Sequence, residues 1–538
     1  MTRPLASLVA DLFGSSPLRH APFRLFYMGS IGAALGYTMQ ATIAAWLMAT
    51  LTPSALMVAL VQTASTVPSL LFGLIAGSLA DIVDRRRVIF ATQIVLLAAT
   101  LALGAATLAG AIGPASLLAL TFVIGAGFTF YMPAQQASIN EFVARVEVPR
   151  AVALNAVAFN VARAVGPALA GGLAAWVGSG STLLAGALFF VLMLLAVRGW
   201  KKRDLALPGV PETLFSGVQS GMRYVRHTPA MRSLVIRNVN FSICASALWA
   251  LLPVIARDQL GLGAGGYGLL SGAFGVGAVA GALAIPRQLQ HKSLNAIVGS
   301  GVLLWTFAIL LVAVTGTTAF ALVGACAAGM AWVTVLASLS AGAQSSAPAW
   351  VRARALATNL VAVQASLALG SVLWGALASA ADTRIALAAS AALLLLLHFA
   401  NRRIRVTMGS EADVTPGVQL PDLAIATEPM PDDGPVLIQI EYQIAPEHHE
   451  AFLRGIHAVG PIRRRNGASS WRVFRDVEEK DRFVERFIIA SWAEYTRLRM
   501  RMTMADRQKL DEVQGLQRKD APMRVSRLLG VDPSGFGA

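Results

Sequence analysis

The chain has 538 residues, of which 56% are hydrophobic and 14% are charged, and its formal net charge is +15. A soluble domain has about 25% charged residues, so this composition excludes an ordinary soluble protein and places most of the chain in a membrane. The basic residues flank apolar segments and form no stripe with interleaved aromatic residues, so no nucleic-acid partner is expected. The two cysteines, Cys244 and Cys326, lie in apolar segments, which predicts neither a disulfide framework nor a cysteine metal site.

Twelve segments are apolar and long enough to cross a bilayer, which takes about 20 residues. No cleavable signal peptide is predicted before the first of them, so that segment is kept as a span. The spans divide into an N-terminal bundle, residues 1–200, and a C-terminal bundle, residues 233–405. The predicted spans are 24–49, 55–80, 87–110, 115–139, 151–177, 182–199, 233–256, 267–286, 294–314, 319–341, 354–379 and 384–401.

Basic clusters follow the even-numbered spans, as in Arg85-Arg86-Arg87 and Lys201-Lys202-Arg203. Four odd-numbered loops contain no Lys or Arg, namely 51–54, 110–114, 178–181 and 315–318. Because basic loops stay on the cytoplasmic side, both termini of this multi-pass chain are predicted to be cytoplasmic, in a plasma (inner) membrane.

A sequence pattern near residue 150 recurs 204 positions later. The aligned pairs are Arg150 with Arg354, Asn155 with Asn359, Asn160 with Gln364, Gly73 with Gly277, and Gly77 with Gly281. Two related halves of six spans each are typical of a transporter whose binding site lies between the repeats.

The loop between spans 2 and 3 has a glycine, two acids and three arginines in close succession. Gly77 would let span 2 approach a neighbour closely, and Asp81 lies at the membrane edge, where a carboxylate can accept hydrogen bonds from a helix N-terminus. Arg85 can pair with that acid or with carbonyl groups of the other half. The loop can therefore join the two halves at this membrane edge; in the alternative, its arginines only anchor the topology. The residues concerned are Gly77, Asp81, Asp84, Arg85, Arg86 and Arg87.

Arg163 lies deep in span 5, roughly 18 Å from the start of the helix. A buried arginine normally faces a cavity or a partner, so Arg163 is predicted to face an anionic substrate or polar groups; a structural hydrogen-bond hub is the alternative. Next to it, Gly166 and Pro167 predict a bent helix with close packing, which could take part in a conformational change. A packing kink without directional meaning is the alternative.

Further amides and aromatic residues lie deep in spans 1, 2, 5, 7 and 11. Together they would suit a large amphipathic ligand in a midplane cavity, although each one singly also fits helix packing. The predicted substrate-binding residues are Tyr37, Gln40, Gln62, Asn160, Arg163, Asn240, Trp249 and Gln364. Span 1 contains no acid, so the residue that couples transport to an ion gradient is unassigned, and no ATP-binding loop is present in the sequence.

Two polar segments flank the second bundle. In the cytoplasmic linker 201–232, Leu214, Val218, Met222 and Val225 recur at helical spacing, which predicts an amphipathic helix on the inner membrane face. Residues 406–434 are acidic and rich in proline, which predicts a flexible linker.

Residues 435–538 form a small soluble module. Strand patterns from Val436 to Ile444, Trp471 to Phe474, 482–492 and 523–528, with helices near 452–459 and 493–513, give the ferredoxin-like order βαββαβ. Its histidines and tryptophans show no nucleophile–base pair and no metal spacing, so we expect no enzyme activity, no cofactor and no metal. A regulatory module or a site of self-association fits better.

These features resemble the major facilitator superfamily. The motif from Gly77 to Arg87 is similar to the superfamily's signature loop, although Asp84 stands where that loop usually has glycine. The resemblance implies that this loop, together with the bend at Gly166 and Pro167, gates the conformational change. The segments around Pro133-Ala-Gln135-Gln136 and Asn155, with Arg163, resemble the branch that includes the enterobactin exporter and transmembrane secretion effectors. The tail resembles antibiotic-biosynthesis-monooxygenase-like domains in Gly467 to Trp471 and in Ser491 to Glu494.

The resemblance implies an all-α membrane protein with twelve transmembrane helices in two pseudo-symmetric bundles, plus a small α+β ferredoxin-like cytoplasmic domain. We predict a secondary-active exporter, an antiporter, that moves small hydrophobic, drug-like or siderophore-like molecules across the bilayer by alternating access, driven by a proton gradient. The alternatives are an uptake carrier, a bifunctional transporter whose tail is a cofactor-free monooxygenase-like enzyme, and a channel or lipid scramblase.

Overall fold

The computed structural model describes residues 17–144, 146–200, 214–417 and 429–530, except for the side chains at 74, 78, 81, 82 and 214–218. The chain forms two compact units. Unit 1 comprises Met1–Pro211, Arg237–Ser338 and Val361–Arg405. Unit 2 comprises Glu212–Ile236, Leu339–Leu360 and Val406–Ala538.

The N-terminal half of unit 1 consists of long helices that follow a short 3-10 helix, Pro17–Arg19. Local side-chain caps set where some of them begin. The Ser54 hydroxyl accepts from the Met57 amide at 3.4 Å, and the Asp84 carboxylate accepts from the Arg86 amide at 2.9 Å. The helices are α2 (Ala21–Leu51), α3 (Ala55–Ile82), α4 (Arg85–Leu108), α5 (Pro114–Phe142), α6 (Val148–Val177) and α7 (Ser179–Arg198).

The second set of long helices begins after the linker. The first of them ends in a five-residue π-helical segment, Ile255–Gln259 (η2), a deviation from α-helix that is common near functional sites. Two others, α12 and α13, have residues in both units. The helices are α9 (Pro229–Val254), α10 (Ala264–His291), α11 (Leu294–Val314), α12 (Thr318–Ser346), α13 (Ala349–Ala380) and α14 (Thr383–Ala400), with a 3-10 turn, Asn401–Arg403 (η3), after α14.

Each predicted span corresponds to one of these helices. Among the described residues, 11 helices are long and apolar enough to cross a membrane. The helix α2 is not among the 11, since Gln40 and several threonines lower its apolar character, but it has 31 residues and packs on α7 and α6. Most helices extend a few residues beyond the predicted spans, because polar residues at the ends continue the helical hydrogen bonding.

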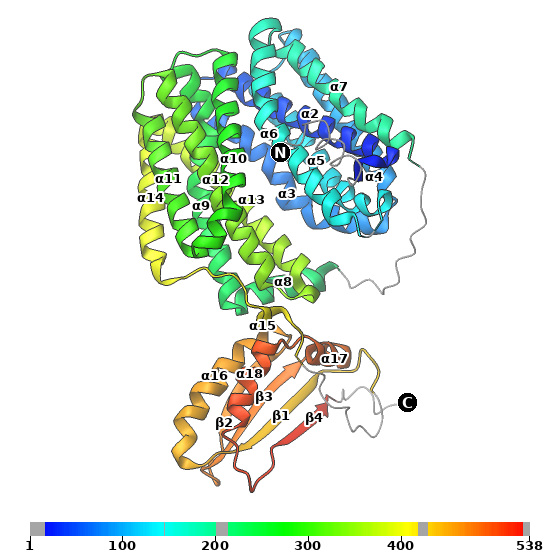
Figure 1. Ribbon diagram of the computed structural model, residues 1–538, viewed down its shortest axis with the longest axis vertical. Coiled ribbons are helices and arrows are strands. Elements are labelled where there is room, and N and C mark those ends of the chain that lie inside the picture. The colour runs from blue at the N-terminus through cyan, green and yellow to red at the C-terminus, as the bar shows by residue number, and fades with distance from the viewer. Residues whose placement is uncertain (1–16, 145, 201–213, 418–428, 531–538) are drawn as a thin grey trace, which may run out of the picture. The chain divides into compact units, whose positions relative to one another are not determined.

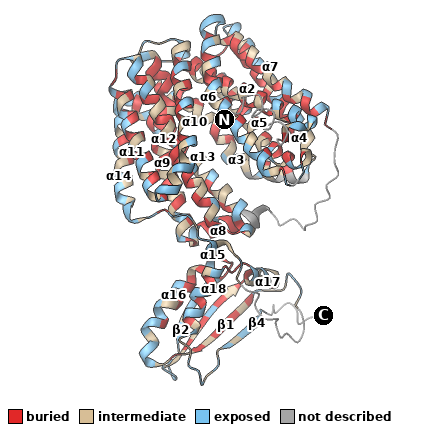
Figure 2. Ribbon diagram, viewed as in Figure 1, coloured by how far each residue is buried: buried red, intermediate tan, exposed pale blue. Residues whose placement is uncertain are grey.

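The helices of unit 1 gather as α2–α7, blue to cyan in Figure 1, and α9–α14, green to yellow. Within the first group α3 packs on α5, and α2 and α4 pack on α7. Large apolar side chains remain exposed on outer faces, for example Leu283 at 77% and Leu396 at 66%, and Figure 2 shows such exposed stretches. An exposed apolar surface of this kind is what contact with lipid requires.

The tail in unit 2 is a four-stranded antiparallel sheet with the order β2-β3-β1-β4. The four strands predicted from the sequence are present in it. Alternate residues of β1, beginning with Val436, are buried against helices, and Figure 2 shows the buried residues in red along the strands. The elements are β1 (Val436–Gln443), α16 (His449–Arg465), β2 (Ser469–Arg475), β3 (Arg482–Ile489), α17 (Trp492–Met500), α18 (Met504–Gln514) and β4 (Arg524–Leu529), with a 3-10 turn, Pro446–His448 (η4), before α16.

Two expectations for this region are corrected. The single helix expected over 493–513 is broken into α17 and α18, because Thr503 caps a new helix by accepting from the Asp506 amide at 3.3 Å. The described parts of the linker 406–434 are not the flexible chain that the sequence predicted. They include a short helix, Glu411–Val414 (α15), and they bond to the tail through the Gly417 amide to the Met502 carbonyl at 2.8 Å and the Trp492 amide to the Asp433 carbonyl at 2.7 Å.

The predicted amphipathic helix is present as α8 (Leu214–His227). The side chains of Leu214 and Val218 lie outside the described residues. Of the other two expected apolar positions, Val225 is buried and Met222 is 59% exposed. The remaining parts of the linker, residues 201–213, also lie outside the described residues.

Candidate functional site

The helix ends of unit 1 fall into two sets. The basic ends lie beside Arg85, Arg287 and Arg402, and the distal ends lie opposite, beside Thr52 and Thr315. At the distal ends, the Arg257 guanidinium of the C-terminal half donates to the Thr52 carbonyl of the N-terminal half at 3.0 Å. The helices α3 and α13 meet there too, where the Leu56 amide donates to the Ser379 hydroxyl at 2.8 Å. That amide belongs to the first turn of α3, so a side chain of one half satisfies a helix-end donor of the other.

The helices α6 and α10 form a glycine seam between the halves, from the distal ends to mid-helix. A Cβ on Gly171 would lie 2.7 Å from the Ala264 carbonyl oxygen, and one on Gly268 would lie 2.8 Å from the Pro167 carbonyl oxygen. Gly275 is equally close to Ala164. Such close backbone approach requires glycine, as in helix pairs within membranes.

Beyond mid-helix, towards the basic ends, α10 packs on its own half. A Cβ on Gly281 would lie 2.7 Å from the Met330 carbonyl oxygen of α12, and Gly277 lies against Cys326 of the same helix. On α6, Asn160 and Val157 are exposed over the corresponding stretch. The contacts that join the halves thus belong to the distal side of the seam.

A cavity of about 470 Å³ lies towards the basic ends, among α2, α5 and α6. An amide pair stands at its centre. The Gln135 amide nitrogen donates to the Asn155 side-chain oxygen at 2.7 Å and to the Ser30 hydroxyl at 2.9 Å, while the Asn155 amide donates back to Gln135 at 3.3 Å. The lining residues include Ser30, Ala34, Tyr131, Met132, Gln135, Gln136, Ile139, Val152, Asn155, Phe159 and Asn160.

This lining combines apolar walls with a few fixed hydrogen-bonding groups. Such a surface can bury an uncharged amphipathic molecule and orient it by its polar atoms. The amide oxygens accept hydrogen bonds and the amide nitrogens donate them, so the cavity imposes no single charge on a ligand.

Among the predicted substrate-binding residues, Asn160 lines this cavity. Arg163 lies one turn further along α6, is half-buried, and has no acidic side chain within ion-pair distance among the described residues. Tyr37 stacks on Phe128 with ring centroids 3.8 Å apart. Gln40 is buried, and its side-chain nitrogen has no hydrogen-bond partner in the described part of the chain. Gln62 is half-buried in α3.

The other three predicted residues belong to the C-terminal helices. Trp249 lies in an aromatic core, with its ring centroid 4.4 Å from that of Phe274 and 5.9 Å from that of Trp332. Asn240 on α9 and Gln364 on α13 are half-buried. None of the three lines the cavity described above.

The predicted gating loop makes its described contacts within the N-terminal half. Arg85 pairs with Glu141 of α5 at 3.1 Å and donates to the Ala80 and Ala137 carbonyls, both at 3.2 Å. Asp84 caps α4, which explains an acid where the family loop usually has glycine. The side chain of Asp81 lies outside the described residues.

The remaining predicted gating residues differ in what they contact. Arg86 donates to the Arg198 carbonyl at 3.2 Å, and Arg87 is exposed. The close approach expected at Gly77 is absent, since a Cβ there would meet no described atom within 4 Å. Gly166, in contrast, lies directly against Thr38 of α2, and α6 continues as a helix through Pro167.

Sequence reasoning did not place Gln135, Asn155, Ser30 or Tyr131 in the site. Two signals were available, because Asn155 belongs to the internal repeat and Gln135 to the segment that resembles the exporter branch. The seam glycines of α10, Gly268 and Gly275, were not singled out either. Their partners on α6 are distant in sequence, and no spacing rule links the two helices.

Comparisons with known proteins agree with this fold. The family model described as "Transmembrane secretion effector" matches residues 13–534. The multidrug efflux pump Tap of Mycolicibacterium fortuitum is 24% identical over 392 residues, which are 70% of this chain and 94% of that protein.

Two solved transporters show the same fold. A bacterial homolog of the human lysosomal transporter Spinster, in an inward-facing and unoccupied conformation, has a TM-score of 0.60 at 14% identity over 72% of this chain and 98% of that one. A mutant of the nucleoside transporter NupG has a TM-score of 0.60 at 13% identity over 71% of this chain and 99% of that one. With its two sets of six helices, the cavity beside the glycine seam and the match to almost its entire length, the chain belongs to the transmembrane secretion effector family of major facilitator superfamily transporters.

Proposed function

We propose that the protein exports small hydrophobic, drug-like molecules from the cytoplasm by alternating access. The observation that carries this proposal is the asymmetry of unit 1. The halves are joined by Arg257 and the glycine seam at the distal ends, and the amide-lined cavity lies towards the basic ends. If basic loops are cytoplasmic, the cavity is accessible from the cytoplasm, the side from which an exporter takes its cargo.

The chemistry of the cavity supports a hydrophobic cargo that carries few charges. Met132, Ile139 and Phe159 offer apolar contact area, and the Gln135–Asn155 pair offers hydrogen bonds in both directions. The similarity to a protein named a multidrug efflux pump favours the same class of cargo. The proposed cargo includes siderophore-like molecules, which carry many hydrogen-bonding groups.

The gating residues have a role in this scheme. Arg85 is held by Glu141 of its own half, which leaves the basic ends of the two halves free to separate. In the opposite state, Asp81 and Arg85 would contact the other half and close the basic side. Arg163, one turn from the cavity-lining Asn160, would contact polar atoms of the bound molecule or an anionic group on it.

We expect a proton gradient to drive the cycle. The first span contains no acid, and the coupling group is therefore sought among the carboxylates at the basic ends, such as Glu141. Because Glu141 already binds Arg85, its protonation would release that arginine and link proton uptake to gating.

The test is energised uptake of a fluorescent lipophilic cation and of an uncharged dye into everted membrane vesicles. Gln135→Ala and Asn155→Ala should each raise the apparent KM about tenfold, because each leaves its amide partner unpaired in the cavity. Asn401→Ala removes a side-chain amide outside the cavity and should leave the KM unchanged. Accumulation in right-side-out vesicles instead would identify an uptake carrier, and gradient-independent, non-saturable flux would identify a channel.

A further inference from the structure

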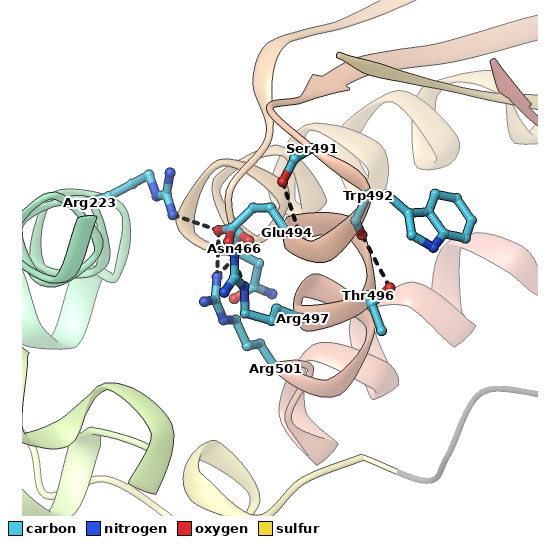
Figure 3. A network of polar contacts seen from close by, with 8 residues as sticks. All are labelled: Arg223, Asn466, Ser491, Trp492, Glu494, Thr496, Arg497 and Arg501. Carbon is cyan, nitrogen blue, oxygen red and sulfur yellow. Dashed lines mark hydrogen bonds and ion pairs between the residues drawn. The ribbon is translucent and has the colours of Figure 1, made fainter. Parts of the chain in front are cut away.

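The carboxylate of Glu494 in the tail contacts three arginines, which come from two parts of unit 2. It lies in the first turn of α17, whose cap is Ser491. Arg223 of α8 donates to its carboxylate at 3.1 Å, Arg501 at 2.7 Å and Arg497 at 3.0 Å (Figure 3). Arg223 approaches from a different helix than the two tail arginines, as Figure 3 shows, so this carboxylate links the linker helix to the tail.

Aromatic contacts reinforce the same junction. The Arg501 guanidinium lies over the Trp350 ring, 4.5 Å from its centroid, and Trp350 belongs to the first turn of α13. The Arg465 guanidinium lies 5.5 Å from the centroid of the Tyr224 ring on α8. Desolvated cation–π contacts of this kind add to the ion pair and define its orientation.

The partners on the helix side are themselves tied together. The Tyr224 hydroxyl donates to the Ser346 carbonyl at the end of α12 at 2.9 Å, and its ring meets Trp350 edge-on with centroids 6.1 Å apart. A Cβ on Gly221 would lie 2.9 Å from the Arg354 carbonyl oxygen of α13. The helix α8, the α12–α13 turn and the tail therefore form one packed junction within unit 2.

Burial makes this junction specific. Tyr224 is 1% exposed and Arg501 is 6% exposed. A buried guanidinium is stable only while its carboxylate and ring partners stay in place, so opening the junction would separate the Arg501 charge from its partners. Arg465 is held in addition by the buried carboxylate of Asp506 within the tail.

We propose that the tail is a brake on transport, which acts by clamping α8 and the α12–α13 turn through Glu494 and Arg501. Both α12 and α13 run on into unit 1, and alternating access requires the ends of such helices to shift. The docked tail holds those ends in one arrangement, and its release lets them move. The partner of this tail surface is thus a named segment of the same chain. This inference rests on the proposed transport function only in one respect, namely that the brake is measured through the transport rate.

The test compares two charge reversals on the same helix in the full-length protein, reconstituted in lipid nanodiscs. Arg223→Glu places a carboxylate against Glu494, while Arg226→Glu makes the same change at an exposed position of α8. Hydrogen–deuterium exchange of the α8 and α17 amides reports docking without reference to transport. We expect Arg223→Glu to increase exchange in both helices and Arg226→Glu to leave it at the wild-type level.

The same variants in vesicles report the brake. Loss of one charge-assisted contact of about 1.4 kcal/mol would raise the initial transport rate by up to roughly tenfold for Arg223→Glu. Trp350→Leu removes the ring beneath Arg501 and keeps an apolar side chain, so it should also raise the transport rate. It replaces Arg223→Glu as the test variant if that variant does not fold.

The outcomes separate the two ideas. Faster exchange together with faster transport supports the brake. Unchanged exchange in Arg223→Glu and Trp350→Leu overturns the docking itself, and faster exchange with unchanged or slower transport overturns its braking role. If the wild-type protein moves no substrate in any vesicle, the proposed function fails, while the exchange result still decides whether the tail docks.

Discussion

At the scale of single residues, Arg163 is the group whose position is hardest to explain by packing alone. It is half-buried in a helix that faces the seam, and no described acid pairs with it. A cation in such a place is stable only against polar groups, water or a ligand.

We therefore expect Arg163→Ala to lower the efflux rate by at least about tenfold, which is 1.4 kcal/mol of transition-state stabilisation. Arg163→Lys should retain part of the activity because it keeps the charge but not the planar fork. The measurement is energised dye uptake into everted vesicles. Equal activity of wild type and Arg163→Ala, with equal expression, would remove this residue from the transport path.

His227, at the end of α8, makes a pH dependence predictable. Burial lowers its pKa, and the charges of Arg226, Arg464 and Arg223 lower it further. Of these charges only Arg464 belongs to the tail, so release of the tail removes that charge and moves the pKa of His227 towards its ordinary value of about 6.5. The docked state therefore binds fewer protons than the released state. Docking is at full strength above about pH 6.5, and it weakens as the pH falls through and below that value.

The expected result is that α17 amides exchange faster at about pH 5.5 than at about pH 7.5, after correction for intrinsic exchange rates. His227→Gln cannot be protonated, so its exchange in α17 should no longer depend on pH in this range. A pH dependence that persists in His227→Gln would assign the effect to another group.

At the scale of elements, the α6–α10 seam is the contact on which the closed distal side depends. Neighbouring glycines provide a matched test. A Cβ on Gly171 would meet Gly268 and Ala264 at less than contact distance, whereas one on Gly172 would meet no described atom within 4 Å.

Gly171→Val should lower the thermal stability of the purified protein, since overpacking costs about 1–3 kcal/mol, and it should open the distal side. Gly172→Val should change both properties much less. Thermal unfolding in detergent and labelling of a cysteine placed at Ser379 measure the two effects. Similar behaviour of the two variants would mean that the seam is not a close contact in the membrane.

Much of the element scale could be predicted from the sequence. The long apolar segments predicted the twelve long helices of the two bundles, and the alternation of apolar and polar residues from Val436 predicted β1. The break between α17 and α18 was missed because it depends on a single cap at Thr503 inside a charged helical pattern. The cavity was predicted only through Asn160, since hydropathy marks polar residues in a span but does not show which of them face each other.

At the scale of the whole molecule, the internal repeat predicted two halves, and unit 1 contains the first half and most of the second. The halves are not equivalent in detail. Gly277 and Gly281 pack tightly on α12, while a Cβ on the corresponding Gly73 or Gly77 would meet no described atom. The acid of the first copy, Asp81, is replaced by Ile285 in the second. This asymmetry confines the predicted gate to the N-terminal copy.

The central claim is that the two halves rock against each other, so that the distal side, which is closed at the α6–α10 seam, opens as the basic side closes. Pulsed electron spin resonance tests it most directly, with spin labels on cysteines in a Cys244→Ser/Cys326→Ser background. One pair, Val152→Cys with Leu283→Cys, reports the basic ends of α6 and α10, and a second pair, Trp176→Cys with Val314→Cys, reports the distal ends of α6 and α11. We predict that substrate and a proton gradient shorten the first distance and lengthen the second. If both distances stay fixed, or change in the same direction, while the protein transports its substrate, the account is contradicted.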